Sequence, residues 1–182
     1  MKKFIYILIL MPFLALGQKL KIGSEAHGGV IFYLDKTKKH GLVVSTENVG
    51  DWEKYVWGCR GKSIEASEGV KIGTGRVNTD AIAGSCKGVL HAAQACLDYN
   101  KDGFTDWYLP SLEELEEIAN YLGKNSKFSE VLNFDNCYYI SSSQHKNKKF
   151  KVNYAWSVNV YENHSLLSFK SNGHKVRAIR AF

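Results

Sequence analysis

The stretch 98–115, DYNKDGFTDWYLPSLEEL, joins an acidic loop to the start of a helix and decides how the middle of the chain folds. Pro110 and Ser111 are typical of a helix start. Ser111 and Glu114 fit a capping box, in which each side chain satisfies a backbone donor of the other residue. Apolar side chains then recur on one face, at Leu112, Leu115, Ile118, Ala119 and Leu122. The pattern predicts an amphipathic helix from Ser111 that stops at Gly123.

The acidic half of this stretch has the spacing of a calcium-binding loop, with oxygen-bearing residues at relative positions 1, 3, 5 and 9 and Gly103 at position 6. The predicted ligands are the side chains of Asp98, Asn100, Asp102 and Asp106 and the main-chain carbonyl of Phe104. Position 12 is Leu109 where a full site has a bidentate Glu, so Glu113 or Glu114 would have to complete the site. The alternative is an acidic turn in which Asp and Asn side chains satisfy backbone donors. If Ca²⁺ binds, we expect a structural role, and we expect no other cofactor.

The first residues predict a secretory signal, residues 1–17. Lys2 and Lys3 precede an apolar run at 4–14, and small residues at 15–17 suit a cleavage site. The run is shorter than the roughly 20 residues that span a bilayer, so we expect no transmembrane anchor. The remaining residues, 18–182, are expected to form one domain in the periplasm or outside the cell.

The chain has a formal charge of +6, and the basic residues are clustered. The first cluster is Lys146, Lys148, Lys149 and Lys151; the second is Lys36, Lys38 and Lys39; the third is Lys170, Lys175, Arg177 and Arg180. Such clusters attract polyanions, or they are solvated hairpin tips that keep a protein soluble. We expect an anionic polymer rather than a specific nucleic acid as partner. The oligomeric state is not indicated.

The cysteines, Cys59, Cys86, Cys96 and Cys137, are even in number, which in an exported chain suggests two disulfides. Three pairings are possible, and sequence alone does not choose among them. We favour Cys59 with Cys86 and Cys96 with Cys137.

Hydrophobic periodicity predicts an α+β fold. The expected elements are a hairpin at 30–34 and 41–46, a helical region at 78–99 broken near Gly84 and Gly88, the helix from Ser111, and strands at 137–142, 152–161, 166–170 and 175–182. Between them lies a long irregular segment, 48–79, that contains Trp52, Tyr55 and Trp57. These three are candidates for an exposed aromatic platform. Trp107 and Trp156 could stack on sugar rings or belong to the core.

Several segments together resemble the Lcl C-terminal domain family, named for a bacterial collagen-like adhesin. They are GGVIFY (28–33), GLVV (41–44), IGTG (72–75) with Asn78 and Thr79, DWYLPS (106–111) with EEL (113–115), YISSS (139–143), AW (155–156) and VRAIRAF (176–182). The resemblance implies a C-type-lectin-like fold: two main helices packed on a twisted antiparallel sheet, long irregular loops and neighbouring termini. The adhesin's own domain implies binding of sulfated polysaccharide. Ile140 and Ala178 depart from the Trp and Cys that many members carry there.

Enzyme motifs are not evident: there is no His-Glu-x-x-His pattern, and Ser141–Ser143 lack the setting of a nucleophile elbow. We therefore expect a non-enzymatic binding module for an anionic glycan or surface polymer. The ligand contacts would come from Trp52, Tyr55 and Trp57 and from Lys146, Lys148, Lys149 and Lys151. The alternatives are an enzyme of unknown reaction on the same scaffold, or a structural component of an envelope assembly.

Overall fold

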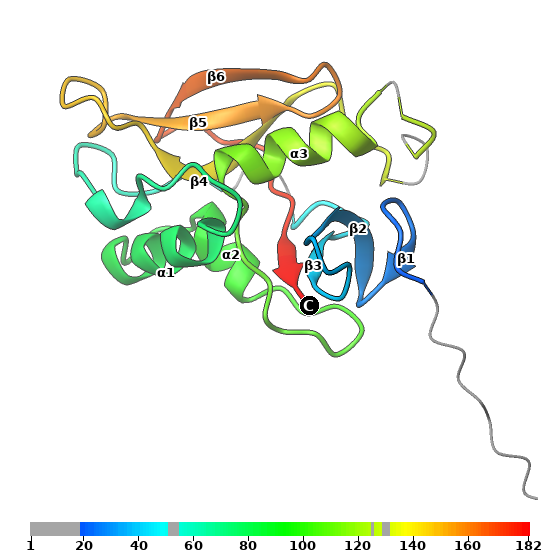
Figure 1. The fold of residues 1–182 in the computed structure, drawn as a ribbon. Coiled ribbons are helices and arrows are strands. Elements are labelled where there is room, and N and C mark those ends of the chain that lie inside the picture. The colour runs from blue at the N-terminus through cyan, green and yellow to red at the C-terminus, as the bar shows by residue number, and fades with distance from the viewer. Residues whose placement is uncertain (1–18, 51–54, 125, 129–131) are drawn as a thin grey trace, which may run out of the picture.

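The structure is a computed structural model that describes residues 19–50, 55–124, 126–128 and 132–182 (Figure 1). Its strands are β1 (Glu25–Ala26), β2 (Gly29–Leu34), β3 (Gly41–Val44), β4 (Tyr138–Gln144), β5 (Tyr154–Asn159), β6 (His164–Phe169) and β7 (Ile179–Ala181). Its helices are α1 (Gly75–Ser85), α2 (Ala92–Leu97), α3 (Leu112–Leu122) and the short 3-10 helix η2 (Glu65–Ser67). The α+β prediction is confirmed. The expected signal segment, 1–17, and Trp52 lie outside the described residues.

The strands form two antiparallel sheets instead of the single sheet expected. The order is β1-β2-β3-β7 in one and β4-β5-β6 in the other. The segment 175–178, predicted as part of the last strand, runs between them. Ile140 of β4 donates its N–H to Lys175 O at 3.1 Å, and Ser45, next to β3, donates its N–H to Ala178 O at 2.9 Å. The last strand is therefore shorter than predicted, because its first half bridges two sheets.

The helical region predicted at 78–99 divides into α1 and α2, and the break lies after Ser85. Gly88 lies in that break with φ +78°, whereas Gly84 stays within α1. His91 caps α2, because its ring Nδ1 accepts the Gln94 N–H at 3.1 Å. The part of the chain that the structure describes thus has three α-helices where the family resemblance implied two main ones.

The hydrophobic core lies on both faces of the β2–β3 pair, so these strands read as continuous apolar runs rather than alternating ones. Ile31 and Val43 belong to one cluster with residues of α1 and α2. Val30, Phe32 and Val44 belong to a second cluster with the apolar face of α3. Alternate side chains of two short strands therefore hold helices on opposite sides (Figure 1).

The buried carboxylate of Glu114 connects α3 to the segment before α1. Its Oε2 accepts the Ser111 N–H at 2.7 Å, which completes the predicted capping box, and its Oε1 accepts the Gly73 N–H at 2.8 Å. A Cβ at Gly75 would overlap the same carboxylate, so this position requires glycine. Burial raises the pKa of Glu114, although the N–H donors around it act in the opposite direction.

Other buried polar side chains extend this contact into what we call the polar junction: Asn78, Thr79, Ser111, Glu114, Ser142 and Ser143. Ser142 and Ser143 lie in a bulge of β4, since the register shifts between Ile140 and Gln144. Ser143 Oγ donates to Gly69 O at 2.6 Å and accepts the Leu112 N–H at 3.0 Å. Thr79 Oγ1 accepts the Leu109 N–H at 3.0 Å. Three separate sequence motifs therefore meet at one buried site.

A second polar contact joins the C-terminal strand to the Asp106 loop and to the turn before β2. Arg180 Nε and Nη2 donate to the two carboxylate oxygens of Asp106 at 2.6 and 2.9 Å, which holds the pKa of Asp106 below its usual range. Arg180 Nη1 also donates to His27 O at 2.8 Å, and the His27 ring stacks on Phe182 with centroids 4.1 Å apart. The turn before β2 and the C-terminus are thereby neighbours.

We predict that Glu114→Gln lowers the free energy of unfolding by about 1–3 kcal/mol, because the amide leaves one buried N–H without an acceptor. The matched control is Glu113→Gln, which removes an exposed, solvent-screened ion pair with Lys71 and should change stability little. Urea denaturation measures both variants. Equal losses in the two would contradict the role assigned to Glu114.

Candidate functional site

The predicted calcium loop contains a two-residue turn. Lys101 and Phe104 exchange backbone hydrogen bonds of 3.2 and 2.9 Å, and the residues between them, Asp102 and Gly103, have φ values of +52° and +82°. This is the left-handed geometry that Asp-Gly favours in tight hairpin turns. The loop therefore turns through backbone hydrogen bonds at this point.

The carboxylates of the loop point to different partners. Asp98 Oδ1 accepts from Gln94 Nε2 at 2.8 Å, and Asp106 is paired with Arg180. Among the residues that the structure describes, no three His, Cys, Asp or Glu side chains are grouped as a metal site requires. A cation would have to draw Asp106 away from a guanidinium. Calcium binding stays a prediction, which calorimetric titration with Ca²⁺ would test.

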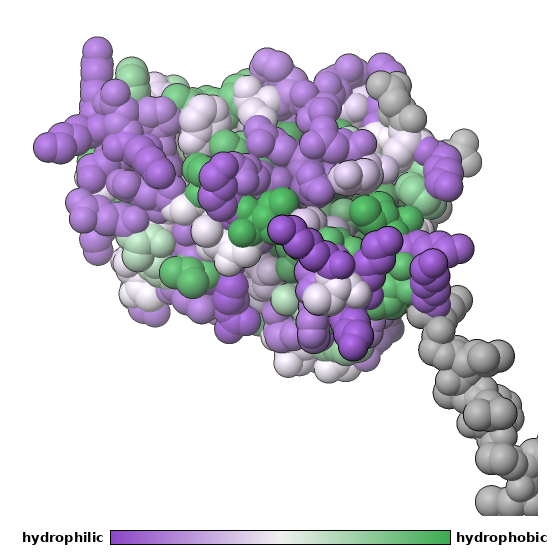
Figure 2. Space-filling model, viewed as in Figure 1, coloured by the Kyte–Doolittle hydropathy of each residue, from purple (hydrophilic) through white to green (hydrophobic). Residues whose placement is uncertain are grey.

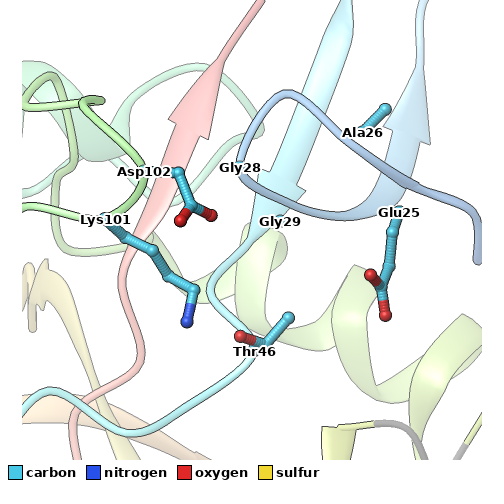
Figure 3. A pocket seen from close by; sticks show the side chains of 7 residues that line it. All are labelled: Glu25, Ala26, Gly28, Gly29, Thr46, Lys101 and Asp102. Atoms are coloured by element: carbon cyan, nitrogen blue, oxygen red, sulfur yellow. The ribbon is translucent and has the colours of Figure 1, made fainter.

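A concavity of about 510 Å³ lies beside this turn (Figure 3). Lys101 and Asp102 form one side, Glu25 the other, and Thr46 lies at the end of β3. Gly28 and Gly29 also line it, and Gly28 allows the Phe104 ring to pack against the backbone, since a Cβ there would meet the ring at 2.5 Å. Its charged groups are exposed or, for Lys101, paired with Glu47 at 3.2 Å, so its lining is solvated and selects no ligand class.

The predicted aromatic platform does not form among the described residues. Trp57 is fully buried, and its Nε1–H donates to Ser141 O at 3.0 Å, so its assignment as an exposed ligand contact is wrong. Trp107 is likewise buried and belongs to the core. Tyr55 is half-buried. The irregular segment folds Trp57 inward because a large apolar ring with one donor is stabilised by burial against a free carbonyl.

The cysteine prediction is half right. Cys59 and Cys86 form a disulfide that joins the irregular segment to the end of α1. Cys96 and Cys137 are free thiols, so the second predicted disulfide is wrong. Cys96 is buried in the cluster with α1 and α2, whereas Cys137 packs against the cluster with α3. The two thiols thus belong to opposite sides of the core.

The basic clusters of the sequence differ in how exposed they are and in whether their charges are paired. Lys146, Lys148 and Lys149 are exposed in the loop between β4 and β5. Lys151 is engaged with two carboxylates, those of Glu65 at 3.1 Å and Glu68 at 3.6 Å. The third cluster is not a surface patch, because Lys170, Arg177 and Arg180 are buried and Lys175 is paired with Asp135 at 2.8 Å.

Aromatic rings gather beside the exposed lysines, at what we call the aromatic end of the β4-β5-β6 sheet: His145, Phe150, Tyr154, Trp156 and Phe169. Each ring contacts the next, with centroids 5.7 Å apart for His145–Phe150, 5.6 Å for His145–Trp156, 5.7 Å for Phe150–Tyr154 and 4.4 Å for Tyr154–Phe169.

The pairing of β5 with β6 positions these rings. Tyr154 is opposite Phe169 and Trp156 is opposite Leu167, so all four side chains lie on one face. α3 covers the other end of this face, where Ser165 Oγ donates to Glu116 Oε1 at 2.7 Å. The end beyond α3 stays open, and Phe169 is 43% exposed there. Sequence alternation indicated the Tyr154–Trp156 face, but only the hairpin register adds Phe169.

The lysine loop projects from the aromatic end. The Lys149 ammonium lies 5.7 Å from the centroid of the Phe150 ring. Figure 2 shows hydrophilic side chains projecting at the left of the view, where Figure 1 places this loop. The site therefore combines flat apolar rings with cations that no described carboxylate pairs. It can hold a ligand that is apolar on its ring faces and anionic at its edges.

The sequence of this chain matches the model of one protein family. The model of the Lcl C-terminal domain matches residues 38–180, which is most of the chain. The chain belongs to the Lcl C-terminal domain family. No curated protein matches it. In the Lcl C-terminal domain described here, no helix within the described ranges is long and apolar enough to cross a bilayer.

A buried lysine lies beneath the loops of this Lcl C-terminal domain. Lys170 Nζ lies 4.1 Å from the centroid of Trp57 and donates to Lys62 O at 3.0 Å and to Gln144 Oε1 at 2.6 Å. No carboxylate pairs with it among the described residues. Burial lowers the pKa of Lys170 to about 7.

We predict that the free energy of unfolding of the native protein rises with pH relative to that of the Lys170→Met variant. Between about pH 7 and 10 the folded state holds Lys170 uncharged while the unfolded chain holds it charged. The unfolded state then binds more protons, so the native protein gains relative stability as pH rises, by up to about 1.4 kcal/mol per pH unit.

Urea denaturation across this pH range measures the difference. Lys36→Met, at an exposed turn, is the control and should leave the pH dependence of stability as it is. Parallel stability curves for the native protein and Lys170→Met would contradict the assigned state of Lys170.

Proposed function

We propose that this domain is an exported, non-enzymatic binding module that holds an anionic polysaccharide at the aromatic end of its β4-β5-β6 sheet. The observation that carries the proposal is the position of three exposed lysines, Lys146, Lys148 and Lys149, in the loop beside a row of contacting aromatic rings, with the Lys149 ammonium over the Phe150 ring. The proposal includes a C-type-lectin-like arrangement, which the contact of the C-terminal segment with the turn before β2 and the long loops support.

The two halves of the surface would contribute differently to binding. The apolar face of a sugar ring would pack on Phe169 and Tyr154, where burial of a flat surface provides affinity. Sulfate or carboxylate groups at the ring edges would pair with the lysine ammonium groups, an attraction that salt screens. A polymer that repeats both features would contact both halves at once.

Removal of the lysines should weaken binding strongly and reduce its salt dependence. We predict that Lys146→Ala/Lys148→Ala/Lys149→Ala lowers affinity for heparin by about 10- to 100-fold at low salt, since each exposed charge contributes about 0.5–1 kcal/mol. The matched control is Lys36→Ala/Lys38→Ala/Lys39→Ala, which removes the same charge from the β2–β3 turn. Calorimetric titration at two salt concentrations measures both. Equal losses in the two triple variants would leave only a net-charge effect and contradict the proposed site.

The aromatic half has its own prediction. Phe169→Ser should weaken heparin binding by about 5- to 10-fold while the salt dependence stays unchanged, because the lost contact is apolar. Val77→Ser is the control, since Val77 is an apolar residue that is 63% exposed on α1, in a different element. A change of salt dependence in Phe169→Ser, with no loss at low salt, would count against ring stacking.

A further inference from the structure

The turn 59–62 places two more cations beside the lysine loop. We propose that Arg60 and Lys62 form a second basic arm of the polyanion surface, an inference that rests on the proposed function. Lys62 donates its N–H to Cys59 O at 3.0 Å, which closes the turn, and Gly61 at its tip has φ +82°. Arg60 and Lys62 are both exposed, and neither pairs with a carboxylate among the residues that the structure describes.

The turn is attached directly to the loop that carries the first arm. Gly61 donates its N–H to Val152 O at 2.8 Å, although the two residues are far apart in the sequence. Figure 1 shows the turn next to the β4–β5 loop, at the same end of the molecule. Two basic segments that no sequence pattern connects thus become neighbours, which is why the sequence clusters did not include Arg60 or Lys62.

Two further contacts hold the turn in place. The Cys59–Cys86 disulfide fixes its first residue to the end of α1, and Lys170 Nζ donates to the carbonyl of Lys62 from beneath. A loop held at both ends loses little conformational entropy when a ligand binds it. The disulfide is therefore a positioning element of the second arm, in addition to its effect on stability.

The distribution of charge limits the ligands that can use both arms. Lys151 pairs with both acidic residues next to the turn, Glu65 and Glu68, and offsets one of their two charges, so the cations free to meet a ligand are those of the two arms. A single sulfate can contact one arm only. A chain of several anionic sugars can cross from the lysine loop to the turn, so affinity should depend on chain length.

The test compares Arg60→Ala/Lys62→Ala with Lys36→Ala/Lys39→Ala, which removes equal charge elsewhere. With long-chain heparin, the arm variant should bind about tenfold more weakly, and its salt slope should fall by roughly one per lost contact. With a heparin disaccharide both variants should equal the native protein. Charge-retaining Arg60→Lys/Lys62→Arg should restore the affinity for the long chain, which a folding defect would not predict.

The outcomes separate this inference from the proposed function. Native affinity in Arg60→Ala/Lys62→Ala, together with loss in the Lys146/Lys148/Lys149 variant, would overturn the second arm and leave the proposed function standing. Native affinity in both would overturn the two together. Loss in the arm variant that the charge-retaining variant does not restore would also overturn the second arm.

Discussion

The buried carboxylate of Glu114 determines where α3 begins and how the segment before α1 turns. It accepts two backbone N–H groups from segments some forty residues apart, Ser111 and Gly73, and excludes any side chain at Gly75. A charged group without solvent is costly unless donors surround it, so the two segments have to be brought together for the carboxylate to be satisfied. Around it, the buried hydroxyls of Thr79 in α1 and Ser143 in the β4 bulge also accept backbone N–H groups of the DWYLPSL segment.

The motifs that identify the family are mostly those that build this scaffold. IGTG, DWYLPS and YISSS meet at the polar junction, and the Asp106–Arg180 pair joins DWYLPS to the C-terminal VRAIRAF segment. None of these contacts lies at the aromatic end of the sheet. Membership of the family therefore specifies a frame, and the proposed ligand surface belongs to the loops that the frame supports.

Those loops are held by a second set of contacts, centred on Lys170. Its Nζ donates to the carbonyl of Lys62 and to the side-chain oxygen of Gln144 above the Trp57 ring, so the turn that carries Arg60 rests on a buried lysine. The exposed lysines of the β4–β5 loop are next to this turn through Gly61 and Val152. The exposed cations proposed for the ligand are thus positioned by a buried lysine that does not itself reach the surface.

The sequence by itself determined those features that depend on residues close to one another in the chain. The capping box, the apolar face of α3 and the stop at Gly123 follow from spacing within single turns, as does the β2–β3 hairpin. Spacing along the chain did not indicate the two-residue turn within the acidic loop or the pairing of Asp106 with Arg180. Likewise, which cysteines pair, which lysines stay exposed and whether Trp57 faces solvent depend on partners more than twenty residues away. Long-range pairing decided these points, since the register of two sheets and the burial of each side chain exist only once distant segments have packed together.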